Sequence, residues 1–387
     1  MVSMKNTQQV DPRFPQSATL HGVGVALMAA AMTLPLAAPV QAESAPEQGQ
    51  ISLKYLDYLD SQPGDPRIRV RATALGLSAP ISGDWLIGGT LTSDGISGAS
   101  PAYHSSGLSQ MREHRRAIDA QATRYFSNAT VTFGASVSSE SDYLSRGLSL
   151  QATRSSESKN TSWSAGLGLS SDIINPSNGV VDHAGKHVFD LLVGVTQVMT
   201  PSDIVKLDLG MSWGSGYLSD PYKVFDERPS ERRHTTLMVR WNRYLASTDG
   251  TLRSSYRYYT DSWDIKSHTL GLEYVQPLSN NWTLTPLARF YSQSAAIFYV
   301  DADPSTEPFP PNPPADAVNY SEDQRLSAFG AVTLGLKLSK RFNADWLVDV
   351  KAESYRQRAD WRLFGNGSPG LAPFNARSIQ LGLSRQF

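Results

Sequence analysis

The pentapeptide GMSWG at residues 210–214 has the G-x-S-x-G spacing that presents a nucleophilic serine in many hydrolases. That chemistry needs a strand running directly into a helix, with the serine at the sharp turn between them and a histidine base nearby. Ser212 instead lies inside an alternating apolar and polar run, and the following SGYLSDPYK has no helical pattern. We interpret the match as coincidental and predict that the chain is not an enzyme. The alternative is a hydrolase whose base would be His234 or His268.

Asp182, His183 and His187 in the segment DHAGKH are residue types that bind zinc or copper. Their segment is predicted to be irregular, so the spacing of the two histidines has no helix to place them on one face. The acidic segment at 301–316 lacks the glycine and final glutamate of a calcium-binding EF-hand loop. The chain also has no phosphate-binding loop or dinucleotide fingerprint. We therefore predict no metal site and no cofactor.

Charged residues recur at alternate positions within otherwise apolar or small-residue segments. Arg67, Arg69 and Arg71 form the densest row, and the others are Lys206, Asp208, Arg240, Arg253, Arg257, Lys266, Glu273, Arg289, Asp349, Lys351 and Glu353. If these side chains line a pore, the arginines and lysines would favour anions. The alternative is a set of ion pairs that only stabilises the interior. Either outcome depends on which way the segments face.

These segments have the two-residue period of strands with one apolar face. In the run at 129–139, Ala129, Val131, Phe133, Ala135 and Val137 alternate with threonine, glycine and serine. Residues 50–387 hold about sixteen such segments, an even number like that of single-chain bacterial barrels. Their predicted centres are Tyr55, Val70, Ile87, Ala120, Phe133, Leu150, Leu167, Val193, Leu209, Val239, Tyr256, Leu272, Leu287, Leu334, Val350 and Leu383.

The connections between the segments alternate in length along the chain. One set consists of tight turns rich in Asn, Asp, Gly and Pro, such as FSNA, TPSD and STDG. The other set includes the long segments 93–113, 172–186, 217–232, 301–323 and 358–374. A soluble sandwich does not sort its loops in this way. The pattern predicts an all-β fold, a transmembrane antiparallel up-and-down β-barrel with short periplasmic turns and long extracellular loops.

Two further features agree with a barrel in lipid. A charge facing lipid at mid-membrane costs about 2–4 kcal/mol, so we expect the alternating charged residues to point inward. Aromatic residues lie beside the predicted short turns, where a membrane barrel carries an interfacial girdle. They are Trp85, Phe126, Trp163, Trp282, Phe342 and Trp346.

The two ends of the chain carry targeting signals. Residues 1–42 resemble a secretory signal peptide with cleavage after Ala42, although an N-terminal membrane anchor is an alternative. Residues 43–49 would then be a short periplasmic segment and 50–387 the barrel. The closing sequence ARSIQLGLSRQF places Ile379, Leu381, Leu383 and Phe387 on one face, as in the C-terminal signal that the barrel-assembly machinery recognises. Arg385 departs from that pattern.

The amino-acid composition limits the classes of partner and metal site that we expect. The formal net charge is −1 and basic and acidic residues are mixed along the chain, so we expect no nucleic-acid partner. The chain has no cysteine, which excludes disulfides and thiolate metal sites.

Several blocks resemble an uncharacterised family of Gram-negative outer-membrane β-barrel proteins that carries a domain-of-unknown-function label. The blocks are ISLKYLDYLD, LTSDGISGASPAYH, HRRAIDAQATRYFSNATVTFGASVSSESDYLSRG, SDPYKVFDERPSERR and SYRYYTDSWDIKSHTLGLEYVQPL. The resemblance spans essentially the whole mature chain. It implies an outer-membrane location and at most an accessory role in an envelope redox or flavin system.

The function we expect is a porin-like channel for small hydrophilic solutes, with anions favoured if the arginine rows line it. The alternative is a non-conducting outer-membrane scaffold for a periplasmic or extracellular redox partner. A second alternative is an outer-membrane hydrolase. The expected partners are outer-membrane lipid and the barrel-assembly machinery, and the sequence leaves the oligomeric state open.

Overall fold

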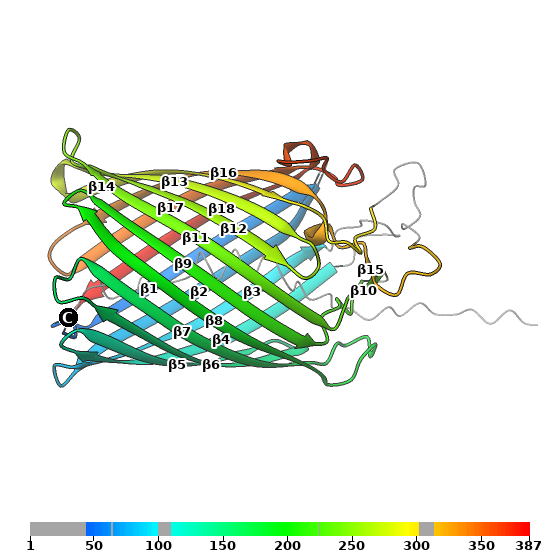
Figure 1. The fold of residues 1–387 in the computed structure, drawn as a ribbon, viewed down its shortest axis with the longest axis horizontal. Coiled ribbons are helices and arrows are strands. Elements are labelled where there is room, and N and C mark those ends of the chain that lie inside the picture. Colours follow the sequence, from blue (N-terminus) through cyan, green and yellow to red (C-terminus); the bar gives the residue numbers. More distant parts are fainter. Residues whose placement is uncertain (1–43, 63–64, 100–109, 224, 302–312) are drawn as a thin grey trace, which may run out of the picture.

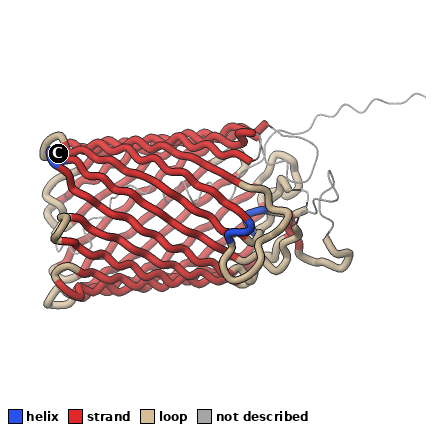
Figure 2. Tube along the Cα trace, turned by 90° about the horizontal axis from the view of Figure 1, so that it is seen from above, coloured by secondary structure: helices blue, strands red, loops and turns tan. Residues whose placement is uncertain are grey.

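The structure, a computed structural model, describes residues 44–62, 65–99, 110–223, 225–301 and 313–387. Sixteen of its strands close into one antiparallel barrel (Figures 1 and 2). The predicted signal peptide and the cleavage position Ala42 lie outside the described residues. Within the described ranges, no helix is long and apolar enough to cross a membrane.

Every predicted strand centre lies within a strand of the barrel, so the fold-class prediction is confirmed. The barrel strands are β1 (Gln50–Gln62), β2 (Asp65–Ile81), β3 (Trp85–Ala99), β4 (Gln110–Phe126), β5 (Ala129–Ser139), β6 (Tyr143–Ser155), β7 (Thr161–Ile174), β8 (Ala184–Thr200), β9 (Asp203–Gly216), β11 (Glu231–Leu245), β12 (Gly250–Asp261), β13 (Lys266–Leu278), β14 (Trp282–Gln293), β16 (Phe329–Arg341), β17 (Trp346–Arg358) and β18 (Phe374–Gln386). The short strands β10 (Asp226–Glu227) and β15 (Tyr320–Ser321) pair with each other in the loops.

The first and last strands close the ring. They pair in register from Gln50 opposite Gln386 to Ser61 opposite Asn375. Next to the pair of Gln50 and Gln386, the backbones of Gly49 and Phe387 form two further hydrogen bonds of 2.9 and 3.0 Å. Because hydrocarbon offers no partner for a backbone N–H or C=O group, this closure is what allows the sheet to lie in a membrane.

The C-terminus and the first described residues lie at one end of the barrel, which we call the turn end (Figure 1). This end also carries the tight turns after β2, β4, β6, β8, β11, β13 and β16. The opposite loop end carries the long connections after β3, β7, β9, β14 and β17. Here the prediction of strict alternation is wrong in part, since the connections after β1, β5 and β12 are as short as turns. The predicted loop at 93–113 is also shorter, because β3 continues to Ala99 and β4 starts at Gln110.

The outer face of the wall is an apolar band. Leu148, Leu169 and Leu334 point outward and are 52, 56 and 59 % exposed. Alternate residues of the same strands point inward and are mostly Ser, Thr, Gly or charged. A continuous exposed apolar band around a closed barrel matches the lipid-facing surface of membrane barrels.

The predicted aromatic girdle is present at the turn end, with each aromatic beside a turn. Cations on neighbouring positions lie over the rings. Arg124 is 5.5 Å from the ring of Trp85, Lys340 is 5.1 Å from Trp282, and Arg385 is 5.4 Å from Trp346. Arg385 therefore belongs to the girdle, where a cation sits near lipid headgroups while its stem covers the apolar wall.

We expect Leu148→Arg to lower the free energy of unfolding by about 2–4 kcal/mol, because Leu148 faces outward in the middle of β6. Its neighbour Ser149 faces inward and is exposed, so Ser149→Arg should change the same quantity by about 0.5 kcal/mol or less. Urea titration of the protein in lipid vesicles measures both. Equal losses for the two variants would contradict the assignment of the outer face.

Candidate functional site

Two of the three arginines in the β2 row, Arg69 and Arg71, do not line the lumen, which contradicts the prediction. Arg69 and Arg71 share the outward face of β2 with Leu75 and Leu77, which are 41 and 50 % exposed. Arg69 donates two hydrogen bonds, of 3.0 and 2.5 Å, to Asp57 on the outer face of β1. The expectation that they point inward is wrong because they lie near the loop end, where an outward charge costs only about 0–1 kcal/mol.

Arg67 does face the lumen, although it has the same parity as Arg69. The pairing of β1 with β2 shifts register between Leu59 and Ser61, and this bulge turns the chain by one position. As a result the Arg67 side chain is buried, with Nε 3.9 Å from Asp60 and its guanidinium 5.4 Å from the ring of Phe374. The lumen positions that follow Arg67 on β2 form an apolar cluster of Ile68, Val70, Ala72 and Ala74.

Lumen-facing charges gather instead on β11 to β14 and on β17. Arg240 lies on β11, Arg253 and Arg257 on β12, Glu273 on β13 and Arg289 on β14, and β17 adds Asp349, Lys351 and Glu353. We call this set the charged sector. Its orientation follows from the register, because outward Leu270, Leu272 and Leu334 occupy the opposite parity.

The charged sector contains pairs and a surplus of positive charge. Arg253 lies 3.9 Å from Glu273, Arg289 lies 3.4 Å from Glu353, and Lys351 lies 3.1 Å from the same glutamate. Among the described residues, no carboxylate lies within ion-pair distance of Arg240 or Arg257. Arg257 donates only to the Thr269 hydroxyl, at 3.3 Å. A mobile anion could therefore balance these two charges.

Space beside these side chains is open to water. The side chains of Arg253 and Glu273 are 53 and 47 % exposed although they point into the barrel. A cavity of about 440 Å³ lies against Arg240, Arg253, Arg289 and Lys351. This part of the interior is not close-packed, in contrast to the core of a soluble domain.

The opposite wall is lined by small residues. Lumen positions of β3 to β8 include Thr90, Gly134, Ser136, Ser149 and Asp190 around a second space of about 360 Å³. Further along the wall, Lys206 pairs with Asp208 at 3.0 Å on β9. Lys337 pairs with Asp349 at 3.5 Å between β16 and β17. Lys266, by contrast, is on the outward face of β13.

Ser212 faces the lumen in the middle of an alternating strand, without the following helix of a nucleophile elbow. Its cross-strand neighbours are Asp190 on β8 and His234 on β11, and His234 is opposite Asp261 on β12. Ser212, His234 and Asp261 therefore follow one another across the strands in the order of a serine, histidine and aspartate triad. However, Asp261 accepts hydrogen bonds from Arg232 and Tyr259. The other candidate base, His268, lies on the outward face and bonds Tyr256.

The weak metal candidates are not brought together. Asp182 and His183 contact each other at 2.5 Å in an exposed connection. His187 has already entered β8, where it faces outward. The C-terminal residues Ile379, Leu381, Leu383 and Phe387 also face outward, at 54, 47, 37 and 58 % exposure.

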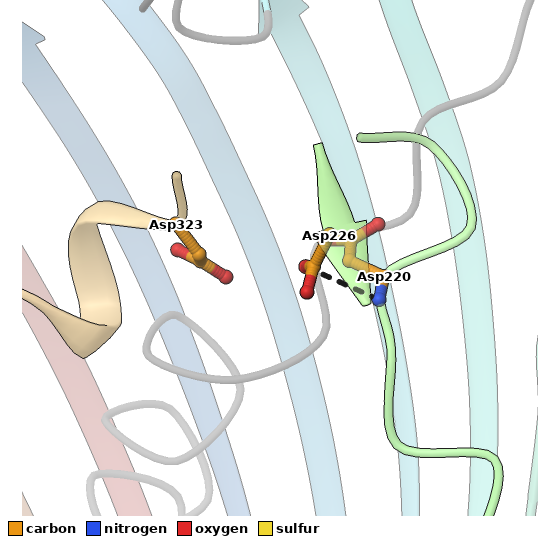
Figure 3. A group of neighbouring side chains, drawn as sticks. All are labelled: Asp220, Asp226 and Asp323. Atoms are coloured by element: carbon orange, nitrogen blue, oxygen red, sulfur yellow. Dashed lines mark hydrogen bonds between the residues drawn. The ribbon is translucent and has the colours of Figure 1, made fainter. Parts of the chain in front are cut away.

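Sequence reasoning missed a buried ion network among the loops. Asp220, Asp226 and Asp323 place carboxylate oxygens within 4.8 Å of one another, and the Asp220 N–H donates to Asp226 at 3.3 Å (Figure 3). Arg228 donates to Asp226 at 2.5 and 2.7 Å and to Asp323 at 2.7 Å. Arg325 donates to Asp220 at 3.0 Å and also contacts Asp323. With every carboxylate bonded to an arginine, the cluster is a salt-bridge network.

The charges in this network set its pKa values. Burial alone would raise the pKa of Asp323, but the positive charges of Arg325, Lys223 and Arg228 outweigh it and hold that pKa below its ordinary value. Burial raises the pKa of Asp226, and the hydrogen bond and charge of Arg228 only partly offset this. Asp323 is therefore the ionised centre to which both arginines bind.

The network ties the long connections to each other and to the rim. Tyr222 bonds Asp142 beside β6, and the Asn178 side chain donates to the carbonyl oxygen of Pro221 at 2.7 Å. On the other side, Gln62 at the end of β1 donates to Gln324 at 3.2 Å. Leu326, which follows Arg325 in the chain, packs in an apolar cluster with Trp263, Ile265, Ala296 and Phe298. No local pattern could reveal this site, since Asp226 and Asp323 are almost a hundred residues apart.

Comparisons with known proteins agree with the fold. A family model described as "protein of unknown function (DUF3570)" matches residues 102–183 and 179–378. No curated protein matches the chain.

Solved structures similar to this chain are outer-membrane barrels. A "bacterial polysaccharide outer membrane secretin" has a TM-score of 0.52 at 8 % identity and covers 88 % of this chain and 98 % of its own. CdiB from Acinetobacter baumannii has a TM-score of 0.48 at 10 % identity and covers 86 % of this chain and 60 % of its own. The CymD monoaromatic hydrocarbon channel has a TM-score of 0.45 at 10 % identity, with 88 and 89 % covered. At these identities the likeness concerns the fold alone.

We expect Arg325→Gln to release the loops, because the variant removes one of the charged partners of the buried Asp323. Breaking a buried ion pair in this way lowers the free energy of unfolding by about 3–5 kcal/mol. Chymotrypsin should then cut within 217–230 or 313–328 much faster, and trypsin should cut faster after Lys223, while the barrel keeps its heat-modifiable mobility on gels. Arg233→Gln is the control, since its pair with Glu231 is 67 and 66 % exposed and such pairs contribute at most about 1 kcal/mol. Unchanged cleavage of Arg325→Gln would show that the network does not hold the loops.

Proposed function

Since the chain belongs to the DUF3570 family of proteins of unknown function, we propose its function from the barrel itself: a porin-like channel for small hydrophilic solutes, with a preference for anions. The observation that carries the proposal is the charged sector, where Arg240 and Arg257 face water-accessible lumen without carboxylate partners. A barrel of sixteen strands is also wide enough to enclose an aqueous passage.

Anion preference follows from the sum of the charges that a solute meets. Five cations of the charged sector, namely Arg240, Arg253, Arg257, Arg289 and Lys351, face two glutamates, Glu273 and Glu353. Asp349 is paired with Lys337. Because fixed charges in a confined lumen act on passing ions at short range, the cation excess lowers the energy of anions relative to cations. The small-residue wall opposite leaves room for the solute.

The proposed location is the outer membrane of a Gram-negative bacterium, with the turn end in the periplasm and the loop end outside. The apolar band, the aromatic girdle and the sorted connections support it. We also propose that Ile379, Leu381, Leu383 and Phe387 form the signal by which the barrel-assembly machinery recognises the chain. Their outward, exposed placement at the closing strand leaves them accessible before the ring closes.

The proposal assigns no catalytic role to Ser212. Its environment supports this, because the neighbouring Asp261 is engaged by Arg232 and Tyr259 and no helix follows the strand. A non-conducting scaffold is the remaining alternative, and it makes a different prediction in a bilayer.

We expect purified protein in planar bilayers to show discrete conductance steps and a reversal potential that indicates anion preference in a KCl gradient. Replacing two unpaired lumen cations, in Arg240→Gln/Arg257→Gln, should lower the anion-to-cation permeability ratio several-fold. The reason is that a unit charge at 4 Å in water contributes about 1 kcal/mol. The slope of the single-channel current–voltage curve measures the conductance, and its zero-current voltage in the gradient measures the permeability ratio.

The matched control is Arg116→Gln/Arg146→Gln, which removes the same charge from outward positions of β4 and β6. It should leave selectivity unchanged. If folded, heat-modifiable protein shows no conductance steps, the channel is rejected in favour of the scaffold. Conductance with unaltered selectivity in the lumen variant would remove the role of Arg240 and Arg257.

A further inference from the structure

The outer surface of the barrel carries a set of cations at one level near the loop end. The outward-facing members among the described residues are Arg69, Arg71, Arg116, Arg146, Arg233, Lys266, Arg356, Arg358 and Arg377. Each shares its face with the apolar band of its own strand, as Arg377 does with Ile379, Leu381 and Leu383. They therefore contact the membrane and not the lumen.

Their height along the barrel places them at a membrane surface. Arg71 and Arg356 each lie ten residues from the turn end of their strands, at Ile81 and Trp346. At about 3.3 Å per residue and a tilt of about 40°, ten residues rise about 25 Å, which is the height of the apolar band of such barrels. The turn-end girdle marks one edge of the hydrocarbon layer, so these cations mark the other.

Four of the arginines gather across the closing seam of the barrel, on β17, β18 and β2. Arg69 and Arg377 are both opposite Leu59, on either side of β1, so their backbones are about 10 Å apart. Arg71 lies two residues further along β2, and Arg356 is opposite Asn375, two residues from Arg377. We call Arg69, Arg71, Arg356 and Arg377 the arginine patch.

The patch has an excess of positive charge that the protein does not neutralise. Asp57 accepts from Arg69 at 2.5 Å and lies 3.5 Å from Arg71. No carboxylate among the described residues lies within ion-pair distance of Arg356 or Arg377, and both side chains are exposed. Two unpaired guanidinium groups beside hydrocarbon need an anion that reaches the interface, since a buried or half-buried charge without a partner is costly.

We propose that the arginine patch binds the phosphorylated headgroup of a lipid in the leaflet at the loop end. Guanidinium groups bind phosphate oxygens through paired hydrogen bonds, and a lipid brings its phosphates to the level at which the patch lies. The adjoining outward residues Ile379 and Leu75 offer apolar wall for its acyl chains. The site is on the outer surface, so it is independent of the proposed channel.

Titration with lipid A, a glucosamine lipid with two phosphates, tests the proposal by native mass spectrometry of the full-length protein in neutral detergent. We expect saturable binding, and we expect Arg356→Gln/Arg377→Gln to weaken it by on the order of 30-fold, at about 1 kcal/mol for each interfacial arginine. If that variant does not show the heat-modifiable mobility of folded barrel, the two single variants replace it. Each should weaken binding about 5-fold.

The control is Arg124→Gln/Arg154→Gln, which removes two outward cations at the turn end of β4 and β6. It should bind lipid A as the unaltered protein does. Dephosphorylated lipid A should bind at least 10-fold more weakly, and millimolar inorganic phosphate should not displace lipid A. Equal binding of the dephosphorylated lipid, equal loss in the control variant, or displacement by free phosphate would each overturn the proposal.

Discussion

Backbone pairing in hydrocarbon is the constraint on which the rest of this structure depends. A strand in lipid cannot leave N–H and C=O groups unpaired, so β1 must pair with β18 and close the sheet into a barrel. Closure makes the two faces of every strand unequal, with one toward lipid and one toward the lumen. Since the side chains alternate, the register of one strand then fixes the facing of its neighbours around the whole ring. The orientation of each charged residue follows from that geometry.

Charges in this barrel occupy three separate environments. Within the lumen, the charged sector is solvated and partly paired, which gives a cationic wall beside open space. At the turn end, Arg124, Lys340 and Arg385 lie over aromatic rings of the girdle. Near the loop end, the arginine patch sits at the upper edge of the apolar band. Charge is tolerated in each place for a different reason: water in the lumen, ring faces and headgroups at one interface, and anionic headgroups at the other.

The loop end is held together by an ion network that is buried, whereas the charges of the lumen wall are exposed to water. Asp323 is almost fully buried, and its ionised form persists because Arg228 and Arg325 surround it. Such a network contributes little net stability compared with an apolar core, yet removal of one member leaves an uncompensated charge. Its effect here is to fix which loops touch, from Asp142 beside β6 to Gln62 on β1. The described loops, which lie together at this end of the barrel (Figure 2), are therefore connected by hydrogen bonds and ion pairs.

Sequence alone determined the strands, their even number, the aromatic girdle and the membrane-barrel class, because a two-residue period and local turn chemistry are properties of short segments. It could not decide the facing of Arg69 and Arg71, because alternation shows that two faces differ without giving their height in the membrane. The bulge that turns Arg67 inward, the cation–π contact of Arg385 and the Asp220–Asp226–Asp323 network were likewise decided by the tertiary structure. Each depends on residues that closure and loop packing bring together from distant parts of the chain, and no local pattern encodes such a meeting.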